Sequence, residues 1–175
     1  MKDILGRFLG RWRVRAVLPY VRGRLLDIGC GTNKLVRSYG DGVGVDVYQW
    51  GSVDLVVENA ANLPFDDESF DSVTIIAALN HIPNRQEVLR EAERLLRVDG
   101  GIIVTMIPPH LSKVWHFFRR PWDADQKERG MVTGEVYGLT RDEVRGLLEK
   151  AGFSVVLEKP FMLHINHLTV ATKNP

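Results

Sequence analysis

Two glycines and a carboxylate are the residues of this sequence best suited to bind a ligand. The segment Asp27-Ile-Gly-Cys-Gly31 follows an apolar run. Glycines at such a turn let a ligand approach the backbone without a Cβ in the way. Asp46 ends the next apolar run, 19 residues after Asp27, where a carboxylate can accept hydrogen bonds from both hydroxyls of a ribose. The pattern predicts a site for a ribose-containing ligand.

A histidine lies beyond the end of a later apolar run. His81 follows the run at 70–77 and is the nearest candidate for a general base, should a ligand have to lose a proton. The alternative is that His81 only hydrogen-bonds the loop before Pro83. His110 and His116 are weaker candidates for the base. No cluster of carboxylates and histidines has the spacing of a metal site, so no metal is predicted.

Strands that alternate with helices must position these residues. Strands are expected at 24–28, 42–46, 53–57, 70–77, 101–107, 154–158 and 165–172. Helices are expected from residue 4 to before Pro19, at 34–39, at 84–97 with Asn84 as N-cap, and from a capping box of Thr140 and Glu143 to near Gly152. This alternation predicts a doubly wound α/β fold with a mostly parallel sheet, whose ligand lies beyond the carboxyl ends of the strands.

Residues 15–107 resemble the class I S-adenosylmethionine-dependent methyltransferases, and especially their quinone and sterol methyltransferase-like branch. Four motifs carry the resemblance. They are the glycine segment Leu25-Leu-Asp-Ile-Gly-Cys-Gly-Thr32, the acid of Gly44-Val-Asp46, the loop Asn59-Ala-Ala-Asn-Leu-Pro-Phe65, and the fourth-strand segments Phe70-Asp-Ser-Val73 and Leu79-Asn-His-Ile82.

The resemblance implies one Rossmann-like methyltransferase domain over residues 1–175, with a mostly parallel seven-stranded sheet and an antiparallel C-terminal strand. It implies S-adenosylmethionine as cofactor and methyl transfer by in-line displacement to a small-molecule acceptor, with O- or C-methylation favoured. Gly29 and Gly31 should line the methionine half, Asp27 should brace their loop, and Val47 should touch the adenine face. The implied cofactor-binding residues are Asp27, Gly29, Cys30, Gly31, Asp46, Val47, Asn59 and Ala60.

The sequence departs from the family pattern at three places. Asn33 replaces a glycine, and asparagine tolerates left-handed backbone better than most residues. Asn59 replaces the aspartate at the adenine amino group, and its carbonyl oxygen can still accept that hydrogen bond. No helix fits between Asp46 and the strand at 53–57, so either Tyr48 or Trp50 covers the adenine, or both are ordinary core residues.

The stretch 108–139 is too long for an ordinary connection, which predicts a lid or a substrate-binding excursion. Its segment 113–122 mixes large aromatics with cations, so it could cap an apolar, lipid-like acceptor or make peripheral contact with a membrane. The alternative is a packed excursion of the core. The aromatic residues of the stretch are Trp115, Phe117, Phe118, Trp122 and Tyr137.

Composition places few limits on the partner. The chain has 175 residues, a formal net charge of +1 and 26% charged residues, which fits an ordinary soluble enzyme better than a protein that coats nucleic acid. The sequence has no charged run long enough to follow phosphates and no nucleic-acid recognition motif, so a small-molecule acceptor is expected rather than a nucleic acid. Cys30 is the single cysteine, and no apolar run approaches the roughly 20 residues of a membrane span. We therefore expect a cytoplasmic protein; the sequence leaves the oligomeric state open.

Two other functions fit parts of the pattern. An NAD-dependent oxidoreductase also needs a glycine turn and a later acid, but its G-x-G-x-x-G pattern requires glycine where Lys34 stands. A degenerate methyltransferase fold that only binds ligands is suggested by Asn33, Asn59 and the missing helix.

Overall fold

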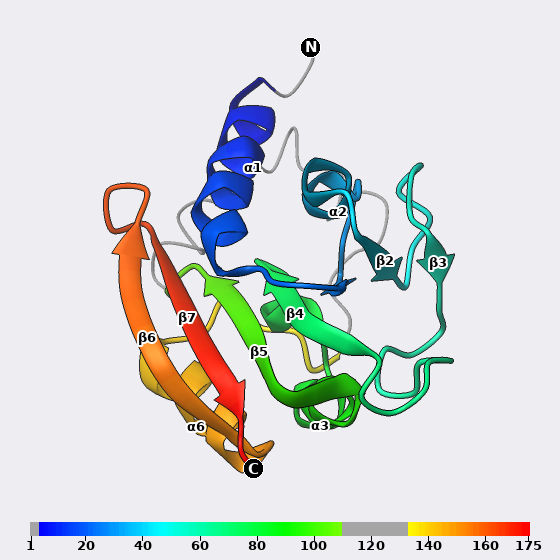
Figure 1. Ribbon diagram of the computed structural model, residues 1–175. Helices are drawn as coiled ribbons and strands as arrows, with labels where there is room; N and C mark the ends of the chain where they lie inside the picture. Colours follow the sequence, from blue (N-terminus) through cyan, green and yellow to red (C-terminus); the bar gives the residue numbers. More distant parts are fainter. Residues whose placement is uncertain (1–3, 110–132) are drawn as a thin grey trace.

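A seven-stranded sheet forms the centre of the computed structural model, which describes residues 4–109 and 133–175 (Figure 1). The strand order is β3-β2-β1-β4-β5-β7-β6. Neighbouring strands from β3 to β5 pair in parallel, whereas β7 is antiparallel to both β5 and β6. The predicted fold class is confirmed, including the antiparallel C-terminal strand. The strands are β1 Leu25–Ile28, β2 Gly42–Asp46, β3 Leu55–Val56, β4 Phe70–Ile76, β5 Leu96–Met106, β6 Phe153–Phe161 and β7 Asn166–Lys173.

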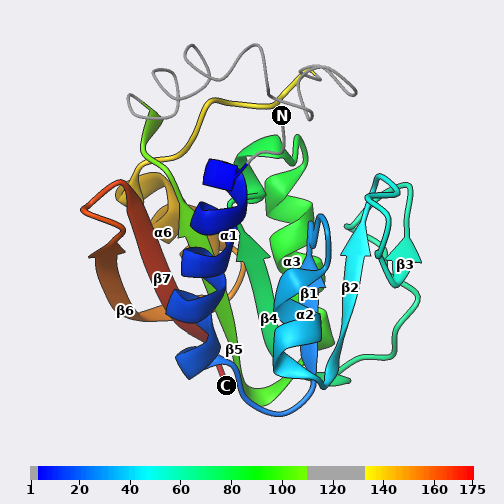
Figure 2. The same cartoon turned by 90° about the horizontal axis from the view of Figure 1, so that it is seen from above.

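Helices cover both faces of the sheet (Figure 2). On one face lie α1, Ile4–Val17, which leads into a short 3-10 turn at Leu18–Tyr20, and α2, Lys34–Tyr39. On the other lie α3, Arg85–Leu95, and α6, Arg141–Lys150. The predicted capping box of α6 is present, because the Thr140 side chain accepts from the Glu143 amide and the Glu143 carboxylate accepts from the Thr140 amide. None of the described helices is long and apolar enough to cross a membrane.

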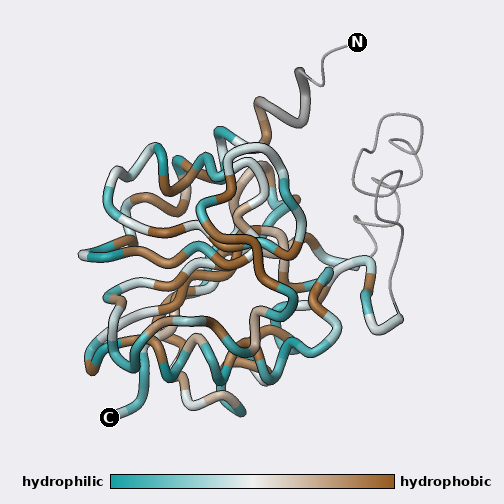
Figure 3. The backbone as a smooth tube through the Cα atoms, turned by 90° about the vertical axis from the view of Figure 1, so that its right-hand side faces the viewer, coloured by the Kyte–Doolittle hydropathy of each residue, from teal (hydrophilic) through white to brown (hydrophobic). Residues whose placement is uncertain are grey.

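Each face of the sheet has its own core. The larger core lies under α3 and α6 and includes Leu26, Phe70, Leu89 and Leu148. The smaller core lies under α1 and α2 and includes Leu25, whose side chain points to the opposite face from that of Leu26. The hydrophobic stretches of the chain accordingly run through the middle of the molecule (Figure 3). A sheet buried on both faces keeps its strands rigid up to their carboxyl ends.

The link between β2 and β3 contains no helix, as predicted. Asp54 organises it instead, since its Oδ2 accepts hydrogen bonds from the Gly44 amide at 2.8 Å and from Asn33 Nδ2 at 2.8 Å. The Asn33 amide group also donates to the Ser52 carbonyl oxygen at 3.0 Å. One carboxylate therefore ties the link to β2 and to the turn before α2.

Several element boundaries differ from the prediction, and the largest difference lies between α3 and β5. Strand β6 also runs to Phe161 rather than ending at residue 158, and β3 is limited to Leu55–Val56. Helix α3 ends at Leu95 rather than near residue 97, and β5 begins at Leu96 rather than at residue 101. The physical reason is that fully buried Leu96 pairs with Phe70 across a bulge in the β4–β5 ladder. Asn84 precedes α3 as expected, but its side chain does not cap the helix; it donates to Asn59 Oδ1 at 3.0 Å.

A buried carboxylate of α3 holds the loop that follows β3. Glu91 is 8% exposed, and its Oε1 accepts from the Leu63 amide at 2.8 Å. Arg94 donates to the Glu91 carboxylate and to the Phe65 carbonyl oxygen. Since buried polar groups are costly unless hydrogen-bonded, this network fixes the path of residues 59–67.

Candidate active site

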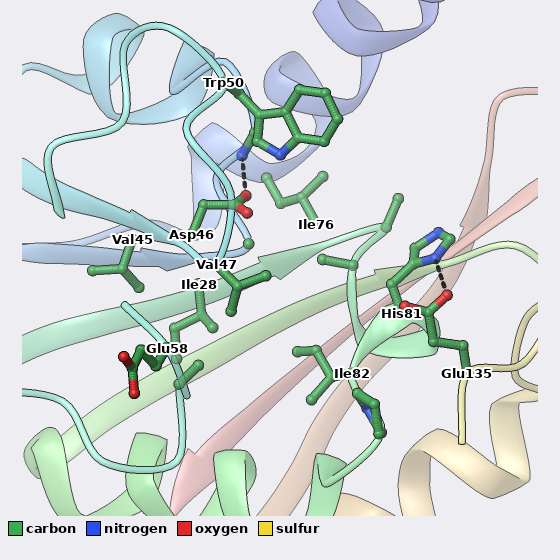
Figure 4. A pocket seen from close by; sticks show the side chains of 16 residues that line it. Ile28, Val45, Asp46, Val47, Trp50, Glu58, Ile76, His81, Ile82 and Glu135 are labelled. Carbon is green, nitrogen blue, oxygen red and sulfur yellow. Dashed lines mark hydrogen bonds and ion pairs between the residues drawn. The ribbon is translucent and has the colours of Figure 1, made fainter. Parts of the chain in front are cut away.

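A cavity of about 470 Å³ lies where β1, β2 and β4 end (Figure 4). This volume is within the usual range for small-molecule sites. Its walls come from the turn after β1, the end of β2 and the segment after it, the loop after β3, and the turn after β4. The lining residues are Ile28, Gly29, Gly31, Val45, Asp46, Val47, Trp50, Glu58, Ala60, Ile76, Ala77, Ala78, His81, Ile82, Pro83 and Glu135.

The glycine turn forms one wall, and its left-handed backbone favours glycine. Gly29 has a φ of 71°, and a Cβ added there would lie 2.6 Å from the Ala78 Cβ. Gly31 has a φ of 54° and open space in front of it. The Gly29 amide donates to the Val45 carbonyl oxygen at 2.9 Å, which fixes the turn to β2. The turn therefore presents bare backbone to a ligand.

Asp46 connects this turn to the segment after β2. Its side chain is 8% exposed, with Oδ2 accepting from the Gly31 amide at 2.9 Å and Oδ1 from the Tyr48 amide at 3.1 Å. An ionised carboxylate has about four acceptor sites. Asp46 can therefore hold the turn and still accept hydrogen bonds from a pair of ligand hydroxyls.

Asp27 lies behind the turn and does not line the cavity. It is 3% exposed and accepts a hydrogen bond of 2.6 Å from the Thr74 hydroxyl of β4. Burial raises the pKa of Asp27 to about 7; the Thr74 bond opposes this rise and the Asp46 charge adds to it. Asp27 therefore braces β1 against β4 just before the turn. Its raised pKa means that burial disfavours the ionised form of this carboxyl group.

The turn accommodates asparagine where the family has glycine. Asn33 has a φ of 55° and is 1% exposed. Its amide donates to Ser52 and Asp54, as described for the link after β2, so side-chain hydrogen bonds offset the strain of a left-handed asparagine. The departure at this position is therefore compatible with the turn.

The expected adenine side is lined by Val47 and Ala60, but not by Asn59. Asn59 Oδ1 accepts from the Ala61 amide at 2.9 Å and from Asn84 Nδ2 at 3.0 Å. Since a carbonyl oxygen has two lone pairs, these bonds use its acceptor capacity within the protein. Glu58, which sequence analysis did not select, lines the cavity instead.

Two aromatic side chains follow Asp46. The rings of Tyr48 and Trp50 are 4.5 Å apart and tilted by 52°, and Trp50 is half-buried and lines the cavity. The indole lies above Asp46 in Figure 4. Of the two interpretations of these aromatics, this position favours a cover over the site.

His81 lies in the 3-10 turn Leu79–His81 and lines the cavity opposite Asp46. Its Nδ1 is 3.6 Å from Glu135 Oε2, and the Glu135 side chain is only 2% exposed. Both residues line the cavity, so the carboxylate holds one ring nitrogen while the imidazole faces the site. This pairing is typical of a histidine whose orientation matters for proton transfer.

Backbone contacts bring Glu135 to this position. The Val136 amide donates to the Asn80 carbonyl oxygen at 3.0 Å, and Asn80 Nδ2 donates to the Val136 carbonyl oxygen at 3.2 Å. Arg85 donates to the Gly134 carbonyl oxygen at 2.8 Å and to that of Leu79 at 3.2 Å. Residues 133–139, which form the described end of the stretch predicted to be a lid, thus lie against the turn after β4.

The predicted site residues separate into two groups. Those that line the cavity are Gly29, Gly31, Asp46, Val47, Ala60 and His81, and those that do not are Asp27, Cys30 and Asn59. Cys30 is half-buried, and burial followed by the nearby carboxylates raises its pKa to about 12, so it stays a thiol. His110, His116 and the aromatic residues from 115 to 122 lie outside the described residues. Among the described residues, no three potential ligand side chains cluster to hold a metal ion.

Comparison with known proteins supports one family. A family model described as "Methyltransferase domain" matches residues 26–104. A demethylmenaquinone methyltransferase of Thermotoga maritima is 26% identical over 91% of this chain and 86% of its own length. Together with the site geometry, these matches support a class I S-adenosylmethionine-dependent methyltransferase. They imply S-adenosylmethionine as the cofactor, rather than the nicotinamide cofactor of an oxidoreductase.

Two further comparisons agree with this assignment to the methyltransferases. An uncharacterized protein of Methanocaldococcus jannaschii is 33% identical over 75% of this methyltransferase, which spans 62% of that relative's length. A crystal structure of a Thermotoga maritima protein, described as a SAM-dependent methyltransferase and possible histamine N-methyltransferase, is 22% identical with a TM-score of 0.70. That alignment covers 96% of this chain and 90% of the other, and it shows a shared fold.

Asp27 should make the stability of the methyltransferase depend on pH. Its pKa is about 7 in the folded protein against 3.8 for an unperturbed aspartate, so the folded protein keeps this proton to higher pH. The free energy of unfolding should therefore fall as pH rises from about 4 to about 7, by on the order of 4 kcal/mol from this group. Urea unfolding across that range should show a flatter profile for Asp27→Asn than for the wild type. Asp41→Asn, at an exposed position, should keep the wild-type slope, and an unchanged slope in Asp27→Asn would contradict the assignment.

Trp50→Ala should weaken binding of S-adenosylhomocysteine roughly tenfold, because an aromatic cover over the site would be lost. Isothermal titration calorimetry measures the affinity, and thermal unfolding checks that stability is retained. Trp12→Ala, at an exposed position on α1, is the matched control and should bind like the wild type. Equal affinities in the two variants would show that Trp50 is an ordinary packing residue.

Proposed function

We propose that this methyltransferase transfers the methyl group of S-adenosylmethionine to a small, largely apolar acceptor, at an oxygen or carbon atom. The observation that carries the proposal is the division of the cavity into two unlike walls. One wall is the glycine turn with Asp46, and the other is apolar except for His81 and Glu135. The first suits a nucleoside, and the second suits an apolar molecule that must lose a proton.

The residues present fit the cofactor. Gly29 and Gly31 expose backbone to the ligand with no side chain in the way. Asp46 has spare acceptor sites for the ribose hydroxyls. Val47 and Trp50 offer apolar contact for the adenine ring. When bound, S-adenosylmethionine supplies a methyl group on a positively charged sulfur, which is already activated for in-line displacement. The protein then has mainly to align the acceptor and exclude water.

The acceptor side is built from the turn after β4. Ile76, Ala77, Ile82 and Pro83 line it, so an apolar ring or chain would be desolvated there without leaving buried polar groups unpaired. The Thermotoga maritima relative named as a demethylmenaquinone methyltransferase supports an acceptor of this kind. The stretch 108–139 would act as the lid over this side, in a single domain and in the cytoplasm.

His81 would act as the general base for an acceptor whose hydroxyl or carbon must be deprotonated. Glu135, at 3.6 Å from Nδ1, would be a positioning residue that orients the ring. The ordering of segment 133–139 by Asn80 and Arg85 would then complete the site. The alternative for His81 is a purely structural role in the loop before Pro83.

Methyl transfer should be detectable with S-adenosylmethionine labelled in its methyl group and a panel of hydroxylated aromatics, quinones, sugars and lipids. Label should enter a quinone or a hydroxylated aromatic, because these are apolar and carry an acidic proton. Asp46→Asn should lose at least tenfold in affinity for S-adenosylhomocysteine, whereas exposed Asp66→Asn should not. Labelling of sugars alone would contradict the apolar acceptor. Binding of S-adenosylhomocysteine with no labelled product from the panel or from a cell extract would favour the non-catalytic binding module.

With that acceptor, His81→Ala should lower kcat about a hundredfold while leaving affinity for S-adenosylhomocysteine unchanged. Glu135→Gln should lower kcat less than His81→Ala does, because the imidazole would lose the partner that orients it. His164→Ala, in the exposed turn between β6 and β7, is the matched control. An unchanged rate in His81→Ala would exclude it as the base, and an unchanged kcat in Glu135→Gln would leave the carboxylate a structural role.

A further inference from the structure

A second hollow, of about 630 Å³, lies between α1 and α2. It is separate from the cavity at the strand ends but shares one side chain with it, since Trp50 lines both. Four cationic side chains from the two helices converge on this groove. They are Arg11 and Arg15 of α1 and Lys34 and Arg37 of α2.

These four cations make no ion pair with any acidic side chain in the described part of the chain. All four are exposed. Other cations of the protein are paired, as Arg94 is with Glu91 and Arg97 is with Asp71. The α1–α2 groove is therefore a local concentration of positive charge in a chain whose net charge is only +1.

Lys34 shows how closely the two helices bring these charges together. A Cβ built on Gly10 of α1 would lie 3.6 Å from the Lys34 ammonium nitrogen, so the side chain of α2 reaches the backbone of α1. Hydroxyl groups of Thr32, Ser38 and Ser52 line the same groove. Guanidinium, ammonium and hydroxyl donors arranged around a hollow match the several acceptor oxygens of a phosphate group.

Apolar surface borders the groove on its outer side. Phe8 is 57% and Trp12 38% exposed, and their rings are 5.8 Å apart in an edge-to-face arrangement. These rings form a neighbouring hollow together with Arg11 and Arg15. A ligand that carries both phosphate and apolar groups would find partners for each within one continuous surface.

We propose that the α1–α2 groove binds the phosphate group of an amphiphilic ligand, with the apolar part of the ligand against Phe8 and Trp12. The phosphate could belong to a phospholipid in a bilayer or to a free phosphorylated molecule, and the groove recognises the chemistry that the two share. This inference goes beyond methyl transfer, because it concerns a site outside the cofactor cavity. Its test is a binding measurement, which gives a result whether or not transfer is detected.

The test compares a groove variant, Arg15→Gln with Lys34→Gln, to a control variant, Arg90→Gln with Lys150→Gln. The control removes the same charge from α3 and α6, on the opposite face of the sheet (Figure 2), at two exposed positions. Thermal unfolding confirms that both variants remain folded. Calorimetric titration with pyrophosphate measures free phosphate binding. Flotation with vesicles of phosphatidylcholine, with and without phosphatidylglycerol, measures binding to lipid headgroups.

The wild type and the control should bind at least one phosphate probe, and the groove variant should bind it roughly 25-fold more weakly, at about a fivefold loss per charge. Pyrophosphate binding would identify a free phosphorylated ligand, and binding only to phosphatidylglycerol vesicles would identify a bilayer. Absence of binding to either probe, or equal losses in the groove and control variants, would overturn the proposal. Binding that is stronger for an RNA duplex than for either probe, and equally reduced in both variants, would also overturn it.

Discussion

The hydrogen bond from the Gly31 amide to the Asp46 carboxylate joins the two segments on which the cofactor cavity depends. One segment is a backbone turn with left-handed glycines, and the other is the end of the adjacent parallel strand. Neither would hold its shape alone, because a glycine turn is conformationally free and a carboxylate at a strand end can rotate. Pairing of β1 with β2 sets the distance, and this bond then fixes the shape of the wall.

Much of this arrangement could be predicted because its determinants are close together in the sequence. The glycines, Asp46, the absence of a helix after β2, and the capping box at Thr140 each depend on residue types within a few positions. The mostly parallel sheet follows from the alternation of apolar runs with helical patterns. The boundary between α3 and β5 was wrong because it depends on a tertiary contact, the pairing of Leu96 with Phe70, which local propensity does not contain.

What the sequence could not predict depends on contacts between distant segments. Glu135 reaches His81 only because Asn80 pairs with Val136 and Arg85 holds Gly134, and no spacing rule connects residues 81 and 135. Asn59 was assigned to the ligand from its place in a motif, yet its oxygen accepts hydrogen bonds from Ala61 and Asn84. The structural role of Asp54 could not be predicted for the same reason, since its hydrogen-bond partners Asn33 and Gly44 lie on other elements.

The position of Trp50 has a consequence for how the two hollows of the molecule behave together. A single indole forms part of the wall of both, so displacement of the ring by an occupant of one hollow alters the shape of the other. Such coupling is reciprocal. If a ligand in one hollow changes the affinity of the other hollow by some factor, the ligand in the second hollow changes the affinity of the first by the same factor. Occupants that displaced this ring would therefore couple the two hollows, without any moving domain between them.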